Sequence, residues 1–287
     1  MFTLRALSSA ASLLLLTSCA LEVGDPQTEP LGTATAEIKN GNVGWHPGVV
    51  ALYYGGVRPC SGVYMGSGAN GYVWVLTARH CVTTDGSLQG PLLSPSAIWA
   101  TAQDNPGLTA PSLAVRYAYS YWQRVVEIRQ IHPTVDLAML RLQAPLDYLA
   151  PSGNTMPVYP SNVSNTPTSS FMDKELQCAG YGRAFNLSLP LGQENGTTGA
   201  GRARWARLTV DYTSPNWLRV PINAQNQIIT NGDSGGPCWY VHNYGKILVG
   251  ISRNSNSASN PTSVWLTAVT GNVHASWING VIQNNWN

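Results

Sequence analysis

The sequence predicts an all-β fold built from antiparallel sheets, with one helix at the C-terminus. Runs of β-branched and aromatic residues, such as 49–54 and 72–76, are separated by short turns rich in Gly and Asn. This close spacing is typical of antiparallel strands rather than of βαβ units. Near the end of the chain, apolar residues recur every four positions from Val273 to Val281, which indicates an amphipathic helix over 273–284.

The expected strands fall into two halves of the chain. A loop-rich stretch at 85–111 interrupts the first half, and a Pro- and Asn-rich stretch at 144–168 indicates a crossover to the second. The clearest strand patterns lie at 49–54, 63–65, 72–76, 113–117, 123–128 and 137–142, and then at 204–210 and 246–251.

Composition excludes several classes of protein. The chain has 287 residues, enough for one or two domains with a sizeable core, and its 44% of apolar residues is typical of a globular protein. Only 10% of the residues are charged, against about 25% in average soluble proteins, and Asn, Ser, Thr and Gly take their place, which suits an exported protein. A net charge of +2 without a basic run argues against nucleic acid or an anionic membrane surface as a partner.

The N-terminus has the features of an export signal. Arg5 precedes an apolar run at 11–16 that is too short to cross a membrane as a helix. The run ends in Leu-Thr-Ser-Cys, which resembles a bacterial lipobox and implies that residues 1–18 are removed and that Cys19 carries lipid. The alternative is an ordinary secretory peptide cut near Ala20, which discards Cys19.

A linker or pro-segment is expected at 19–37, because this stretch has no apolar period, and the folded domain is expected at 38–287. On the lipobox interpretation, the protein is exported and anchored in the cell envelope, at the outer membrane or the surface. The lipid on Cys19 is then its only expected contact with a membrane.

Three short motifs can be combined into one catalytic group. They are Thr-Ala-Arg-His-Cys at 77–81, Asp-Leu-Ala-Met-Leu at 136–140 and Gly-Asp-Ser-Gly-Gly-Pro at 232–237. A serine hydroxyl is a poor nucleophile at neutral pH, so it needs an imidazole base that a third group holds in the right tautomer. Glycines beside the serine let backbone amides face the oxygen of a tetrahedral intermediate, and the amides of Gly232 and Ser234 are placed to do so.

In this order along the chain, the three motifs resemble those of the chymotrypsin/trypsin-like serine proteases, over about residues 38–284. The resemblance implies that Ser234 is the nucleophile, that His80 is the general base and then the acid, and that Asp136 is the carboxylate that orients His80. It also implies two six-stranded antiparallel β-barrels, with the site in the cleft between them.

The implied barrels divide the folded part of the chain. The first barrel is expected over about 38–150 and supplies His80 and Asp136, and the second is expected over about 165–272 and supplies Ser234. The family needs no cofactor and acts on protein or peptide substrates, and we expect a monomer.

The resemblance also gives Asp233 a role. In the family, this residue pairs with an α-amino group that an activation cut releases, and the pair shapes the oxyanion hole. Ile-Lys-Asn-Gly at 38–41 resembles the start of the mature enzyme, so we expect a cut between Glu37 and Ile38. Because Glu37 is not a basic residue, the activating protease is expected to prefer Glu or to be the enzyme itself. The cut would also free the catalytic domain from a lipid on Cys19.

Cysteine usage agrees with export. Apart from Cys19 there are four cysteines, an even number that allows three pairings. No C-x-x-C pair is present, so zinc is not expected. The resemblance implies a disulfide between Cys60 and Cys81, beside the histidine, and a second between Cys178 and Cys238.

The specificity pocket also follows from the resemblance. Its floor is expected at Ile228 and Ile229, which cannot bind the cationic side chains that trypsin prefers. Its wall is expected to include Ser252, Arg253, Ser255 and Ser263. Such a pocket is shallow and apolar and favours small or aliphatic residues on the acyl side.

One position of this wall has two candidates. The family has a serine there, which contacts the aspartate that corresponds to Asp136. An ungapped alignment through Gly250 puts Arg253 at this position, and a one-residue slip puts Ser252 there. We favour Ser252.

The sequence therefore predicts a serine endopeptidase. The alternative is a catalytically silent homologue that acts as a binding or adhesion protein, and its main support is the atypical pocket with Arg253. An esterase that acts on non-peptide substrates is a third option. Because Ser234, His80 and Asp136 are all present, we favour the enzyme.

Overall fold

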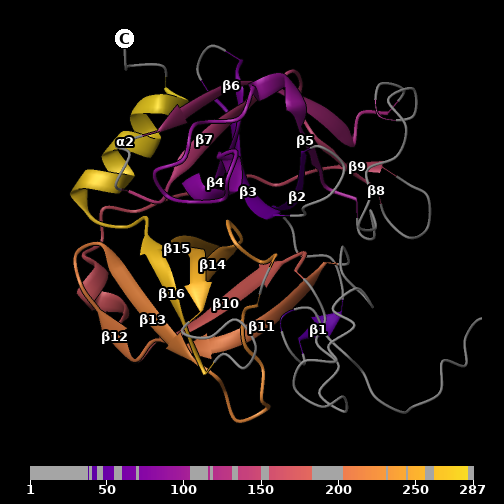
Figure 1. The fold of residues 1–287 in the computed structure, drawn as a ribbon. Helices are drawn as coiled ribbons and strands as arrows, with labels where there is room; N and C mark the ends of the chain where they lie inside the picture. Colours follow the sequence, from indigo (N-terminus) through magenta and orange to yellow (C-terminus); the bar gives the residue numbers. More distant parts are fainter. Residues whose placement is uncertain are drawn as a thin grey trace, which may run out of the picture. The chain divides into compact units, whose positions relative to one another are not determined.

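A computed structural model shows two large β-structures, a small two-stranded sheet and, near the C-terminus, the α-helix α2 (Figure 1). The expected signal peptide, Cys19 and nearly all of the linker at 19–37 lie outside the described part of the chain. The all-β prediction with a C-terminal helix is confirmed. The structure describes residues 38, 41–43, 48–54, 60–68, 71–103, 116, 119–130, 135–149, 155–182, 203–230, 232–243, 245–255 and 262–283.

Six antiparallel strands of the first half close into a barrel, as expected (Figure 1). The order around the barrel is β2-β3-β4-β7-β6-β5. The strands are β2 (Val49–Tyr54), β3 (Cys60–Ser67), β4 (Val73–Thr77), β5 (Ile98–Thr101), β6 (Trp122–Gln130) and β7 (Ala138–Leu142).

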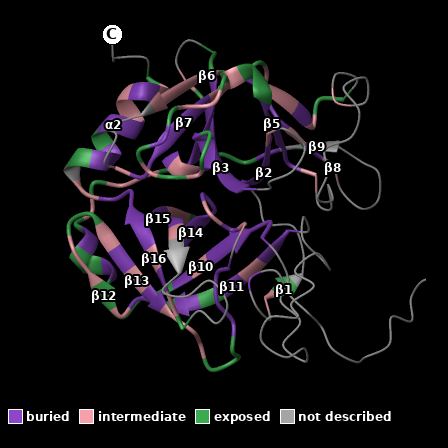
Figure 2. Cartoon of the chain, in the orientation of Figure 1, coloured by how far each residue is buried: buried purple, intermediate pink, exposed green. Residues whose placement is uncertain are grey.

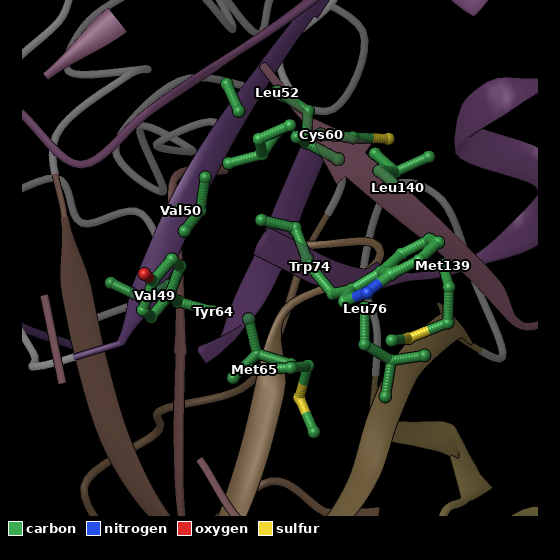
Figure 3. Close-up of a cluster of buried hydrophobic side chains, with 14 of the residues drawn as sticks. Val49, Val50, Leu52, Cys60, Tyr64, Met65, Trp74, Leu76, Met139 and Leu140 are labelled. Atoms are coloured by element: carbon green, nitrogen blue, oxygen red, sulfur yellow. The ribbon is translucent and has the colours of Figure 1, made fainter. Parts of the chain in front are cut away.

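Large apolar side chains fill this barrel. Figure 3 shows Leu76 of β4 beside Trp74, with Met139 of β7 nearby, and all three are fully buried. Strands β2 and β4 are buried on both faces over nearly their whole length (Figure 2). This explains why their sequences are continuously apolar instead of alternating between apolar and polar residues.

The second half forms an eight-stranded antiparallel sheet, which differs from the expected closed six-stranded barrel. Its order is β1-β11-β10-β14-β15-β16-β13-β12, and β11 contacts β13, so the sheet curls. Because the two-residue strands β1 and β12 pair with β11 and β13, they occupy the edges that closure would join. The strands are β1 (Asn42–Val43), β10 (Glu175–Gly180), β11 (Arg204–Thr209), β12 (Tyr212–Thr213), β13 (Trp217–Pro221), β14 (Pro237–His242), β15 (Gly245–Ser255) and β16 (Ser263–Ala268).

Several connections differ from the sequence prediction. The stretch 85–111 contains β5 and the 3-10 helix η2 (Pro95–Ala97), so it is not all loop. The expected crossover contains a two-stranded sheet of β8 (Asp147–Leu149) and β9 (Thr155–Pro157), followed by the 3-10 helix η3 (Thr168–Phe171). The strand expected at 113–117 lies outside the described residues except for Arg116, which is helical.

The C-terminal helix α2 (Asn272–Ile282) lies beside the first barrel (Figure 1). Ile278 and Val281 are buried in the same core as the barrel strands, as the apolar period predicts. Val273 is 71% exposed, so the buried face begins after it, and its assignment to that face was wrong. Among the described residues, no helix combines the length and the apolar character needed to span a membrane.

Candidate active site

His80 and Asp136 meet at the end of the first barrel. His80 lies in the 3-10 helix η1 (Arg79–Val82), just after β4, and Asp136 lies two residues before β7, the neighbour of β4. The backbone amide of His80 donates to Asp136 Oδ1 at 2.9 Å, and His80 Nδ1 lies 2.9 Å from Asp136 Oδ2. Because Nδ1 bonds the carboxylate, it carries the proton of the neutral ring and leaves Nε2 as an acceptor.

The Asp136 carboxylate is almost completely buried, with a side-chain exposure of 2%. Burial acts to raise the pKa of Asp136, but the hydrogen bonds and charge of His80, with the charge of Arg253, lower this pKa below its ordinary value. Asp136 therefore stays ionised while it holds His80, whose side chain is 21% exposed.

Ser234 lies in the loop before β14 and comes close to the disulfide next to His80. The Cys81 Sγ atom is 3.9 Å from His80 Nε2 and 3.4 Å from the carbonyl oxygen of Ser234. The Ser234 hydroxyl donates to the carbonyl oxygen of Arg253 at 3.3 Å. Among the described residues, Ser234 Oγ makes no hydrogen bond to His80, so the hydroxyl must rotate about its χ1 bond to reach the imidazole.

Ser61 of β3, which the sequence analysis missed, joins the first barrel to the loop that carries Ser234. Its hydroxyl donates to the carbonyl of Gly232 at 3.2 Å and accepts from the amide of Tyr181 at 2.8 Å. Its own amide donates to the carbonyl of Ser234 at 2.8 Å, and its carbonyl accepts from the hydroxyl of Thr77 at 2.8 Å. Ser61 is fully buried and holds the position of the loop that carries Ser234.

The amides of Gly232 and Ser234 have no hydrogen-bond acceptor within the part of the chain that the structure describes. Gly232 and Gly235 have φ values of 95° and 82°, a region that glycine adopts without strain. A Cβ atom at Gly235 would also collide with the carbonyl of Ser61. The glycines therefore allow the tight loop and leave both amides available to an oxyanion.

Asp233 is buried between the loop that carries Ser234 and the residues that follow β10. Its Oδ1 accepts from the amide of Gly182 at 2.8 Å, and its Oδ2 accepts from the amide and the hydroxyl of Thr230 at 2.9 and 3.3 Å. The contact of Thr230 with Asp233 was not expected from the sequence. Gly182 must lack a Cβ atom, which would lie 2.6 Å from the carboxyl carbon of Asp233.

Ile38 also reaches Asp233 in the intact chain. The side chain of Ile38 is fully buried in the core of the second half, and its backbone amide is a hydrogen-bond donor to the Asp233 carboxylate. Burial raises the pKa of Asp233 to about 6, although the hydrogen bonds from Thr230, Gly182 and Ile38 act in the opposite direction. Among the described residues, no cationic group forms an ion pair with this buried carboxylate.

Both expected disulfides form. Cys60 and Cys81 link β3 to η1, and Cys178 and Cys238 link β10 to β14, where the two residues face each other in the ladder. Cys60, Cys81 and His80 bring three potential metal-ligand atoms together, but the two sulfur atoms are bonded to each other and offer no thiolate.

The expected pocket residues do not gather at one surface. Ile228 and Ile229 are 0% and 3% exposed and belong to the core of the second half. Ser263 pairs with Pro221 at the start of β16, and the side chain of Ser255 lies outside the described residues.

The preference for Ser252 over Arg253 as the contact of Asp136 was wrong. Arg253 Nε lies 3.4 Å from Asp136 Oδ2, whereas Ser252 is buried and its backbone bonds Gly235 and Gly236. The register between β15 and β16 shifts between Ser252 and Asn254, so Arg253 is the unpaired residue of a β-bulge. Bulges redirect side chains next to active sites, and this one turns Arg253 toward Asp136.

Comparisons with known proteins match most of this chain. A family model described as Trypsin matches residues 36–278. A protein of Corynebacterium glutamicum (strain R), described as an uncharacterized peptidase, is 25% identical to the chain over 279 residues. The match covers 96% of this chain and 81% of that relative.

Proposed function

Because the chain belongs to the trypsin family, whose model spans residues 36–278, we propose that it is a serine endopeptidase with Ser234, His80 and Asp136 as its catalytic triad. The observation that carries the proposal is the double hydrogen bond between His80 and Asp136, at 2.9 Å on both atoms, beside the loop of Ser234. A buried carboxylate that bonds both the amide and the ring of one histidine fixes that ring in the orientation that a general base needs.

Each residue has one task in the proposed reaction. The Ser234 hydroxyl turns from the carbonyl of Arg253 to His80 Nε2, gives up its proton there and attacks the substrate carbonyl carbon. The amides of Gly232 and Ser234 donate to the resulting oxyanion. His80 then gives the proton to the leaving amine, and a water molecule hydrolyses the acyl-enzyme by the same steps in reverse. Asp136 stays ionised throughout and keeps the proton of His80 on Nδ1.

Export and activation belong to the same proposal. Residues 1–18 direct export, Cys19 carries the lipid, and cleavage between Glu37 and Ile38 releases the mature domain. The support is the position of Ile38, which is buried with its amide at Asp233. An ammonium group released at Ile38 would have a buried carboxylate as its partner, and such a pair interacts more strongly than a surface pair. N-terminal sequencing of the active protein tests this proposal, and active protein that begins upstream of residue 38 would refute it.

The second candidate, a silent homologue that binds without cutting, has one observation in its favour. The Ser234 hydroxyl bonds the carbonyl of Arg253 at 3.3 Å instead of the imidazole. In a silent protein this hydroxyl stays on Arg253, whereas in an enzyme it exchanges between the two acceptors.

Peptide hydrolysis distinguishes the two candidates. The wild-type protein should cut a mixed peptide library, and Ser234→Ala should cut none of it. Asp136→Asn should lower kcat by about 10⁴, because the wrong tautomer of His80 then predominates. Ser94→Ala changes an exposed serine that is not part of the proposed triad. It is the matched control and should keep full activity. Equal cleavage by the wild type and Ser234→Ala would refute the proposed triad.

A further inference from the structure

Among the described residues, Arg253 has the only guanidinium group that contacts the proposed triad. Its Nε atom lies 3.4 Å from the Asp136 carboxylate, and its carbonyl oxygen accepts from the Ser234 hydroxyl. The residue therefore touches both the nucleophile and the orienting acid. A peptide whose carbonyl carbon reaches the Ser234 hydroxyl therefore comes close to this residue.

Besides its ion pair with Asp136, the guanidinium of Arg253 lies on an aromatic ring. Its carbon atom lies 4.4 Å from the centre of the Trp217 ring, a cation–π distance. Trp217 is the first residue of β13, and Arg253 is the bulged residue of β15. A guanidinium that rests on an aromatic ring keeps its N–H groups around its edge, where an acceptor can reach them.

Asp136 does not use up the hydrogen-bonding capacity of Arg253. Both Asp136 oxygens already accept from His80 at 2.9 Å, and the contact with Arg253 is longer. The pair Arg219–Asp211 gives an internal comparison, because there two nitrogens donate to two oxygens at 2.9 and 3.1 Å. No hydrogen bond from the guanidinium of Arg253 to any described residue is present, and its side chain is 31% exposed.

We propose that Arg253 is a subsite for a carboxylate-bearing side chain on the acyl side of the peptide, close to the bond that is cut. This inference rests on the proposed function and names the substrate class of the same site. The planar N–H fork of arginine matches a carboxylate in two parallel hydrogen bonds. The Arg253 side chain is 31% exposed and can meet an incoming carboxylate, whereas the Asp136 side chain is only 2% exposed. The expected pocket floor adds no competing charge, since Ile228 and Ile229 are apolar and buried.

The bond expected to be cut during activation has an acidic residue on its acyl side. Glu37 immediately precedes Ile38, the expected first residue of the mature domain. An acidic side chain on the acyl side of that bond is what the subsite would bind, so the same preference would let the enzyme process its own precursor.

The test uses pairs of peptides that differ only by Glu or Gln, with the residue placed in turn at the first, second and third position before the cut. The wild-type enzyme should show kcat/KM at least tenfold higher for Glu than for Gln at one of these positions. Arg253→Gln should bring the ratio to within twofold of one, and Arg253→Lys should keep part of the preference because it keeps the charge. The control Arg207→Gln, at a 64% exposed arginine of β11, should leave the ratio unchanged.

Binding to the Ser234→Ala protein separates this inference from the proposed function. If that protein binds the Glu peptide at least tenfold more tightly than the Gln peptide, and Arg253→Gln abolishes the difference, the subsite stands even if no peptide is cut. If the wild type cuts Gln peptides as well as Glu peptides at all three positions, the subsite is refuted while the protease stands. A Glu preference that persists in Arg253→Gln would also overturn the proposal, because another group would then bind the carboxylate.

Discussion

The buried acid at Asp233 should make the intact chain less stable as the pH rises. Burial raises the pKa of this carboxyl from 3.8 to about 6 in the folded protein. As the pH rises, Asp233 loses its proton in the unfolded chain before it does so in the folded chain. Between these two pKa values the folded state binds more protons, so the free energy of unfolding falls over that pH range. A pKa difference of roughly two corresponds to about 3 kcal/mol of unfolding free energy, lost mostly between pH 4 and 6 and completely by about pH 7.

The assay is urea denaturation of Ser234→Ala protein, which lacks the proposed nucleophile, compared with the same protein carrying Asp233→Asn. The difference between the two isolates Asp233 from the other titrating groups. Asn disturbs the bonds from Gly182 and Thr230 equally at each pH, so only the pH dependence is informative. The unfolding free energy of the Asp233 protein should fall by about 3 kcal/mol relative to the Asn protein between pH 4 and 7. A constant difference, or one that favours Asp233 at higher pH, would refute the reasoning.

The cut chain provides the control for this prediction. A protein that begins at Ile38 carries an ammonium group where the intact chain has the amide that bonds Asp233. An opposite charge beside a carboxylate favours its ionised form. The loss of stability between pH 4 and 7 should then disappear. If the cut and intact chains lose the same free energy, the new ammonium does not reach Asp233.

Three further variants test the contacts that hold the site. Ser61→Ala removes the hydrogen bond to the Gly232 carbonyl and the buried one from the Tyr181 amide, so it should cost about 2 kcal/mol in urea unfolding and lower kcat more than it raises KM; unchanged stability would contradict this. Gly182→Ala puts a Cβ atom against Asp233 and should cost about 1–3 kcal/mol, measured as a lower Tm; an unchanged Tm would mean that the loop yields freely. Replacing Cys178 and Cys238 by Ala opens a loop of 60 residues and should cost up to about 4 kcal/mol by the chain-entropy estimate, which calorimetry of the double variant would check.

The triad motifs were readable in the sequence because each is a contiguous string. The residues that identify the histidine and the serine stand directly beside them in the sequence: a buried strand precedes His80, and glycines surround Ser234. Ser61 gave no such signal, because its partner Gly232 lies 171 residues away and nothing around Cys60 marks the serine. Contacts of this range depend on how the two halves pack, which the local pattern does not contain.

Errors of the sequence analysis arose where register decides the outcome. The choice between Ser252 and Arg253 depends on a β-bulge, and a bulge inserts one residue without any fixed residue type. The four-residue strand β5 was missed because so short a run resembles a loop. The second half curls but stays open, because the two-residue strands β1 and β12 pair at the edges that closure would join, and strands this short leave no periodic pattern in the sequence.

The central claim is that Ser234 is a nucleophile activated by His80 and Asp136. Its most direct test is the reaction of the folded protein with a fluorophosphonate, followed by intact-mass and peptide mass spectrometry. We expect one adduct per chain, located on Ser234, and no adduct in either Ser234→Ala or His80→Ala. Failure of the folded wild-type protein to react, or an adduct that persists in Ser234→Ala, would contradict the account.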